Sequence, residues 1–406
     1  MKVLKDSAIY MLGELLNRAI PFMLLPYLTR ELGPAGYGSL SVYQSISLIL
    51  VILIGMSLDG AVTRYYYRYG LRNIYNVINL GVAFSAVLTA IIVITALLNG
   101  SCIIAIVSLS AFFQFILKVT LAFFQCQKQP IKYIKVQLIA GILNLIVTLV
   151  LFELFSASAE NRIIAILLAN LLIGGSVYLV LFASHLPLPK RKKNNYLCLS
   201  YIISFGFPLV FHNLAIFLKG QADKLILAST FSLSDVGLYS SGYQLASIFL
   251  ILFTAINKGI TPYFYAAAKK GSLTEKKVRF ISLCLFVLLP FLYFPFSIAS
   301  DYVAYIILGK DFLGAGHFFS IFILGFLFVP AYYVLVNYLF YMGKTKVIAS
   351  ATILTSLMHF SAVYFLSKVK LSYVPFSLVF SNITLVIVLY TCVYLIGKGN
   401  VKKSEA

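Results

Sequence analysis

Charged residues are scarce in this chain of 406 residues, and basic residues far outnumber acidic ones. Only 11% of the residues are charged, 32 of them Lys or Arg and 12 Asp or Glu, whereas soluble globular proteins carry about 25%. Because 61% of the residues are hydrophobic and the mean hydropathy is +0.97, the composition excludes a soluble globule and predicts an integral membrane protein. The net charge of +20 does not indicate a nucleic-acid partner, since the basic residues lie in short clusters between apolar runs.

Patterns for metal, redox or nucleotide chemistry are also missing. The five cysteines are scattered singly without CxxC spacing, and the four histidines share no ligand spacing. None of the three Gly-Lys pairs has a glycine five positions before it, so there is no phosphate-binding Walker loop. We therefore predict no catalytic residues, no metal ion and no cofactor, and a chain that is not an enzyme.

Long apolar runs dominate what is present. A membrane-spanning helix needs about 20 mostly apolar residues, and the runs here lack the alternation that is typical of strands. Pro21 and Pro26 lack amide donors and predict a bend in the first run. The sequence thus predicts an all-α polytopic membrane protein with twelve transmembrane helices, near 7–29, 39–60, 76–98, 102–124, 136–155, 163–183, 208–230, 240–262, 280–299, 317–337, 347–366 and 376–397.

The distribution of Lys and Arg predicts the orientation of these helices. With the N-terminus inside, the connections on one side of the membrane hold 22 Lys and Arg residues and those on the other side hold 5. Positive residues concentrate on the cytoplasmic side. We therefore predict that both termini are cytoplasmic in a multi-pass protein of the bacterial inner membrane.

The most polar connection lies in the middle of the chain. It carries Pro187, Pro189 and a basic run at 190–193. We interpret 1–185 as an N-terminal six-helix bundle, 186–207 as a cytoplasmic basic linker with an interfacial segment that turns at Pro208, and 208–406 as a C-terminal six-helix bundle. Two parallel halves place a cavity between them.

Cations inside the predicted spans are the strongest functional signal. A charge at the bilayer centre costs at least about 2.5 kcal/mol and usually faces a bundle interior or a watery cavity. Arg18 lies near the middle of the first run and Lys219 near the middle of the seventh, in equivalent helices of the two halves. We predict a cationic cavity for an anionic substrate, lined by Arg18, Lys219, Lys224 and Lys118. Lys118 has the alternative of extending to the membrane surface.

Acidic residues accompany both central cations. Glu14 lies four residues before Arg18, and Asp223 lies four residues after Lys219. On a helix this spacing stacks the two side chains. One interpretation is a pair of structural ion pairs; the other is that Glu14, Asp223 and Asp59 couple transport to an ion.

A basic and aromatic segment follows the second run. Arg64, Arg68 and Arg72 are interleaved with several tyrosines at the predicted cytoplasmic surface. Membrane topology alone explains these arginines. The functional interpretation is a surface that gathers a lipid pyrophosphate before its transfer.

Three segments carry a resemblance to a known family. They are LPYLTRELGPAGYG at 25–38, Gly206-Phe207-Pro208 followed by Asp223-Lys224 and DVGLY at 235–239, and ILGKDF at 307–312. In their order and spacing among twelve spans, they resemble bacterial polysaccharide-repeat flippases of the Wzx type, which belong to the multidrug/oligosaccharidyl-lipid/polysaccharide exporter superfamily.

The resemblance implies a MATE-like fold that works by alternating access. It also implies a substrate, an undecaprenyl-pyrophosphate-linked oligosaccharide of an O-antigen or capsular repeat, moved to the periplasmic leaflet by antiport of protons or Na⁺. A polysaccharide polymerase and a chain-length regulator are the expected protein partners.

Other functions stay open at this point. A multidrug or organic-ion antiporter has the same fold, although a cationic cavity would repel cationic drugs. A membrane glycan polymerase or glycosyltransferase would need an acidic pair in a polar loop, and none is visible. A non-catalytic scaffold for glycan assembly is a further alternative.

Overall fold

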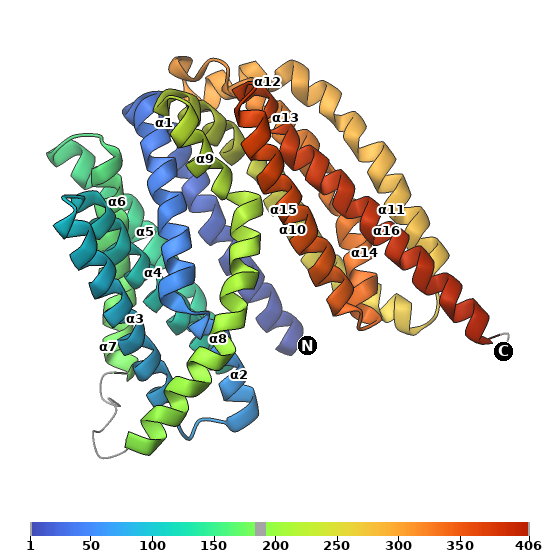
Figure 1. Ribbon diagram of the computed structural model, residues 1–406, viewed down its shortest axis with the longest axis horizontal. Coiled ribbons are helices and arrows are strands. Elements are labelled where there is room, and N and C mark those ends of the chain that lie inside the picture. Colours follow the sequence, from blue (N-terminus) through green and yellow to red (C-terminus); the bar gives the residue numbers. More distant parts are fainter. Residues whose placement is uncertain (1, 183–191, 405–406) are drawn as a thin grey trace. The chain divides into compact units, whose positions relative to one another are not determined.

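The fold is helical in every region that the computed structural model describes. These regions are residues 2–182 and 192–404, with side chains at 20–182 and 195–398, and they contain no strand (Figure 1). The elements are, in order, α1 Lys2–Gly55, α2 Leu58–Tyr69, α3 Ile74–Leu98, α4 Cys102–Cys126, α5 Pro130–Leu154, α6 Ala159–Asn170, η1 Leu171–Gly175, α7 Ser176–Phe182, α8 Lys192–Gly220, α9 Ala222–Thr230, α10 Leu233–Lys269, α11 Glu275–Leu288, η4 Leu289–Leu292, α12 Tyr293–Leu308, η5 Lys310–Phe312, α13 Ala315–Leu327, α14 Val329–Tyr341, α15 Thr345–Ser367, η6 Leu371–Tyr373 and α16 Phe376–Ser404.

The predicted fold class is confirmed. Within the described residues, eleven helical stretches are long and apolar enough to cross a membrane. The first of them, Ile20–Tyr69, takes in most of the first two predicted runs because α1 continues through both. The other ten predicted runs fall on the later helices.

Helix α1 is interrupted at one residue instead of by a loop. Gly33 has φ 61° and ψ 178° and is the non-helical position inside α1. Glycine adopts a positive φ at little cost, and the following Pro34 suits the first turn of the next helical segment. At Pro21 and Pro26, where the sequence predicts a bend, the backbone dihedrals stay helical.

The chain folds into two compact units. Unit 1 comprises Met1–Leu24 and Ser39–Phe217, and unit 2 comprises Leu25–Gly38 and Leu218–Ala406. Helix α8 runs through Pro208 without the predicted turn and is assigned to unit 1 as far as Phe217. The boundaries at 185–186 and 207–208 stay a sequence-based prediction.

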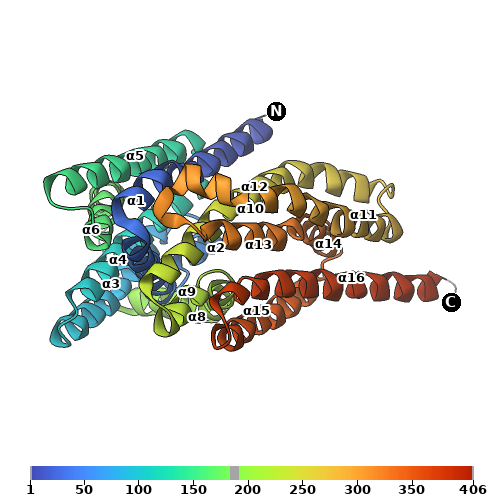
Figure 2. The same ribbon diagram turned by 90° about the horizontal axis from the view of Figure 1, so that it is seen from above.

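Unit 1 has its core where α2, α3, α4, α7 and α8 meet. The buried side chains there include Ile78, Phe115, Phe123, Phe182 and Ile202. Helix α4 packs against α2, α3 and α6, and α5 packs against α6 (Figures 1 and 2). Aromatic rings fill the centre; Phe123 and Phe182, for example, meet edge to face with centroids 5.2 Å apart.

Unit 2 is built around α13 and α14. Helix α10 packs along both of them, α12 covers α13, and α16 lies beside α13, α14 and α15 (Figures 1 and 2). Its largest core cluster includes Leu335, Leu339, Leu385 and Leu389. Pro290 and Pro330 explain why two of the predicted spans are divided, since proline cannot donate the helical hydrogen bond.

The segment Leu25–Gly38 joins unit 2 through a very close backbone approach. A Cβ atom added at Gly38 would lie 1.9 Å from the Leu233 carbonyl oxygen, and one added at Gly237 would lie 1.9 Å from the Pro34 carbonyl oxygen. Only glycine allows the backbones to come this close. The two glycines therefore set the contact between this segment and the start of α10.

Two further contacts fasten the same segment. The Arg30 guanidinium donates a hydrogen bond to the Ile306 carbonyl oxygen at 2.9 Å, near the end of α12. The Tyr37 ring meets Phe312 edge to face, with centroids 6.1 Å apart. The stretches 25–38, 235–239 and 307–312, which carry the family resemblance, thus meet at one junction within unit 2.

We predict that Gly237→Ala destabilises the protein. The added methyl group collides with the backbone at Pro34, and overpacking of this kind costs about 1 to 3 kcal/mol. Thermal unfolding of the purified protein in detergent, followed by circular dichroism, should show a lower midpoint. Gly259→Ala in the same helix is the matched control, because nothing lies within 4 Å of its added Cβ; equal midpoints for the two variants would contradict the junction.

Candidate functional site

A buried polar cluster lies at the start of α9 in unit 2. Gln221, with φ −144° and ψ −21°, separates α8 from α9 and places Asp223 in the first turn of α9, where a negative charge is favoured. Asp223 Oδ1 accepts a hydrogen bond from the Lys224 amide at 2.9 Å, and Oδ2 accepts one from the Tyr239 hydroxyl at 2.5 Å. Asp223 is 3% exposed and Tyr239 is fully buried. Both carboxylate oxygens are therefore already engaged.

Lys224 is held beside this carboxylate by neutral groups. It is 7% exposed, its Nζ donates a hydrogen bond to Gln221 Oε1 at 2.7 Å, and the same nitrogen lies 5.3 Å from the centroid of the Tyr243 ring. Phe322 meets the Tyr243 ring edge to face, with centroids 5.1 Å apart. A cation over a buried aromatic ring gains on the order of 2 kcal/mol, which helps to offset the loss of water.

Lys219 does not form the ion pair that its spacing suggests. Helix α8 ends at Gly220, so the four-residue spacing between Lys219 and Asp223 spans a break instead of one helical turn. Within the described side chains, Lys219 has no ion pair and Asp223 bonds to Tyr239 and Lys224 instead. Lys219 is half-buried and, unlike Lys224, its ammonium has neither a hydrogen bond nor an aromatic ring as a partner among the described side chains.

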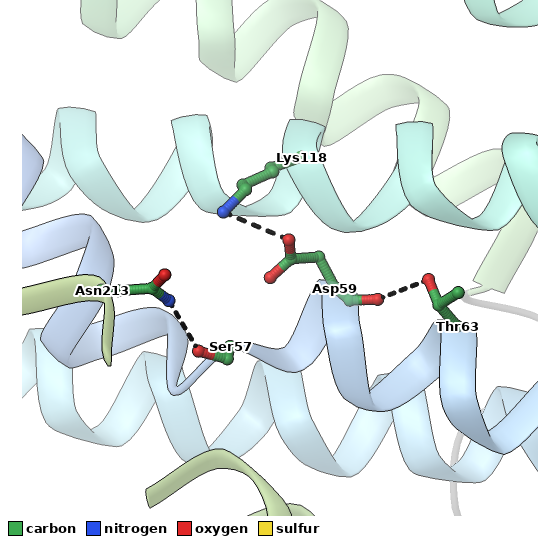
Figure 3. A network of polar contacts seen from close by, with 5 residues as sticks. All are labelled: Ser57, Asp59, Thr63, Lys118 and Asn213. Carbon is green, nitrogen blue, oxygen red and sulfur yellow. Dashed lines mark hydrogen bonds and ion pairs between the residues drawn. The ribbon is translucent and has the colours of Figure 1, made fainter. Parts of the chain in front are cut away.

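Unit 1 has a distinct break between α1 and α2, near the end of the second predicted span. Met56 and Ser57 adopt left-handed conformations, with φ 44° and 52°. Such residues cost roughly 1 to 3 kcal/mol each and persist where the surroundings hold them. Here Gly206 of α8 lies against Met56, where an added Cβ would lie 2.1 Å from the carbonyl oxygen, and Asn213 Nδ2 donates a hydrogen bond to Ser57 Oγ at 3.0 Å (Figure 3).

The structure brings two predicted site residues together beside this break. Lys118 Nζ of α4 lies 3.1 Å from Asp59 Oδ2, in the first turn of α2 (Figure 3). Their side chains are 54% and 27% exposed, before any lipid is considered. The ion pair neutralises Lys118 inside the protein, so this cation has a carboxylate partner, unlike Lys219.

The three arginines of the predicted basic surface differ in their exposure. The Arg64 guanidinium lies 5.0 Å from the Phe205 ring centroid and 5.6 Å from that of Tyr201, so it is half-buried against α8. Arg68 and Arg72 are exposed at the end of α2 and in the turn that follows. These two arginines are the ones in reach of a ligand from outside the protein.

Two predicted site residues stay a sequence-based prediction. Arg18 and Glu14 belong to α1, but they lie outside the residues whose side chains are described.

Sequence reasoning missed Tyr239 and Asn213 as partners of the predicted sites. The signal for Tyr239 was its place in the 235–239 stretch that carries the family resemblance; nothing singled out Asn213, because its role depends on a helix break that the sequence does not announce.

We predict that Tyr239→Phe destabilises unit 2 by about 1 to 3 kcal/mol, because the buried Asp223 carboxylate then loses a hydrogen-bond donor. The measurement is the thermal unfolding midpoint in detergent. Tyr302→Phe removes the same hydroxyl from a residue that is 69% exposed and should leave the midpoint unchanged. Removing the carboxylate as well, in Asp223→Asn with Tyr239→Phe, should restore part of the loss; additive losses would show that the hydrogen bond does not stabilise the fold.

Comparison with known proteins places the chain in a family. Residues 3–267 match the family described as polysaccharide biosynthesis protein. The chain is 36% identical over 391 residues to Lsg locus putative protein 1 of Haemophilus influenzae, a match that covers 96% of this chain and 98% of that protein. It is also 36% identical over 395 residues to an uncharacterized membrane protein of the same organism, with 96% of each chain covered.

Solved transporter structures share the fold at low sequence identity. The lipid II flippase MurJ, in an inward closed conformation, superimposes with a TM-score of 0.76 at 13% identity, covering 95% of this chain and 87% of that one. An inward-facing multidrug resistance MATE family transporter superimposes with a TM-score of 0.69 at 14% identity, covering 97% of this chain and all of that one. These findings confirm the resemblance predicted from the sequence, and the chain belongs to the polysaccharide biosynthesis protein family.

Proposed function

We propose that this protein is a flippase for an undecaprenyl-pyrophosphate-linked oligosaccharide in the bacterial inner membrane. It moves an O-antigen or capsular repeat unit from the cytoplasmic to the periplasmic leaflet, with coupling to an ion gradient, and acts as a transporter without catalysing a reaction. Family membership and a fold shared with a lipid II flippase support the proposal.

The observation that carries the proposal is the state of Lys219. A cation in a membrane-spanning helix normally has a partner or a watery cavity. Lys118 has its carboxylate and Lys224 has an amide and an aromatic ring. Lys219 is half-buried without an ion pair among the described side chains, so its ammonium is available to a pyrophosphate.

The exposed arginines give this function an entry surface. Arg68 and Arg72 lie at one end of α2, and guanidinium groups recognise phosphate oxygens through paired hydrogen bonds. Arg64 is committed to the rings of Tyr201 and Phe205 and holds this end of α2 against α8. We therefore assign the gathering of the lipid headgroup to Arg68 and Arg72, and a positioning role to Arg64.

The experiment is a flipping assay in reconstituted vesicles with undecaprenyl pyrophosphate that carries a short oligosaccharide. We predict that Lys219→Met lowers the initial rate at least about tenfold, which corresponds to about 1.4 kcal/mol of lost stabilisation. Lys219→Arg, which keeps the charge, should retain most of the rate. Lys310→Met changes an exposed lysine outside the long helices and serves as the control.

If the Lys219→Met variant flips the lipid as fast as the Lys310→Met control, the proposed role of Lys219 is wrong. If the wild-type protein leaves the distribution of the lipid between the two leaflets unchanged, the flippase proposal is wrong. Protein amount per vesicle must be matched, because a misfolded variant would also be slow.

An antiporter for multidrug or other organic ions is the second candidate, since MATE transporters share this fold. The buried Lys224 and the half-buried Lys219 disfavour cationic drugs, because like charges repel in a medium of low dielectric constant. The same vesicles test this candidate: uptake or release of a cationic dye that requires the protein would favour it over the flippase.

A further inference from the structure

One buried histidine has a setting that neither the fold nor the proposed substrate site explains. His359 lies in the middle of α15 and is 2% exposed. Among the described residues neither of its ring nitrogens makes a hydrogen bond of good geometry, and the one group near enough to be a weak partner is the Ser377 backbone. Helix α15 packs against α9 and α16 within unit 2, so the ring is enclosed by its own unit.

A second unpartnered group lies next to it. The Ser377 hydroxyl, at the start of α16, is also buried without a hydrogen-bond partner among the described residues, and the Ser377 backbone lies close enough to interact with the His359 ring. Each unsatisfied buried polar group costs about 1 to 3 kcal/mol. In native proteins such groups are explained by an ordered water, an ion or a functional role. Two of them on neighbouring helices, α15 and α16, indicate a small polar ligand.

Two charged groups are near enough to interact electrostatically with His359. They are the Asp223 carboxylate of α9 and the Lys219 ammonium of α8. Lys224 of α9 is directed to Gln221 and Tyr243, while Tyr239 of α10 donates its hydroxyl hydrogen to Asp223.

The other helices that pack on α15 bring no further charge to this level. Helix α14 contains no charged residue, and the charged residues of α16 begin at Lys398, near the end opposite to Ser377. His359 is therefore an imidazole without a hydrogen bond of good geometry, near one carboxylate and one ammonium group.

We propose that His359 is the proton-binding residue of unit 2, with Ser377 and a water completing its hydrogen bonds. This inference deepens the proposed function and rests on its ion coupling. The free ring nitrogen takes a proton from water and the ring changes from neutral to a charge of +1, with Asp223 as its counter-charge. Asp223, the residue that the sequence suggested for this task, has both oxygens engaged by Tyr239 and Lys224 and acts as a fixed charge.

The chemistry of the site selects a proton over Na⁺. Hard cations such as Na⁺ prefer several oxygen ligands, whereas the open group here is an imidazole, the side chain whose charge changes near neutral pH. The coupling ion that this site accepts is therefore a proton.

The direct test observes His359 without any substrate. Changing the other three histidines, His185, His212 and His317, to Gln leaves His359 as the single histidine. With ¹⁵N-labelled histidine in lipid nanodiscs, the imidazole resonances should move from the neutral to the protonated positions between about pH 5 and pH 8. Excess NaCl in place of KCl should leave the titration unchanged. A ring that stays in one state across this range, or that responds saturably to Na⁺, overturns the proposal.

A second measurement links the proton to transport. In vesicles with and without a pH gradient, the ratio of the two flipping rates should fall to about one in His359→Gln, because the amide can donate and accept hydrogen bonds but cannot take up the proton. His317→Gln, at an exposed histidine, is the matched control and should keep the wild-type ratio. A wild-type ratio in His359→Gln overturns the proposal.

The two measurements separate this inference from the proposed function. If the wild-type protein flips no lipid, the flippase proposal fails while the resonance titration still decides whether His359 binds a proton. If the lipid is flipped with no dependence on a pH gradient in the wild-type protein, the flippase stands and the coupling role of His359 fails.

Discussion

The close backbone approach of Gly38 and Gly237 is the contact on which unit 2 depends. It places Leu25–Gly38 against the start of α10, and Arg30 and Tyr37 then fix this segment to the region around the end of α12. Helix α10 in turn supplies Tyr239 to the buried Asp223 carboxylate. The polar cluster at the start of α9 is therefore connected to the same junction through two residues of one helical turn, Gly237 and Tyr239.

The cations within the predicted spans are stabilised in different ways, and the differences suggest a division of roles. Lys118 forms an ion pair with Asp59, and Lys224 uses an amide oxygen and an aromatic face. Both are compensated locally, as expected for charges removed from water. Lys219 lacks an ion pair among the described side chains, and His359, which is within electrostatic range of Lys219, lacks a hydrogen bond of good geometry there. A bound anion would supply the opposite charge that Lys219 lacks, and a bound proton would occupy the free ring nitrogen of His359.

Much of the architecture was predictable because it follows from local composition. The apolar runs had to be helices, since a helix satisfies its own backbone hydrogen bonds in lipid. The break at Met56 and Ser57 was not predictable, because neither residue type is typical of a left-handed conformation. Gly206 and Asn213, which are distant in sequence, hold this conformation. The same holds for Lys219 and Asp223, whose spacing predicts an ion pair that the end of α8 at Gly220 prevents.

By itself, the sequence determined that this is an all-α membrane protein with a resemblance to polysaccharide-repeat flippases, because hydropathy and short motifs act over neighbouring residues. It also predicted which charges lie at membrane depth. Only the tertiary structure decided which of these charges are compensated: Asp59 meets Lys118 across two helices, Asp223 is held by Tyr239, and His359 is enclosed without a partner among the described residues. The physical reason is that the stabilisation of a buried charge depends on groups a few ångströms away in space, which the order of residues along the chain does not reveal.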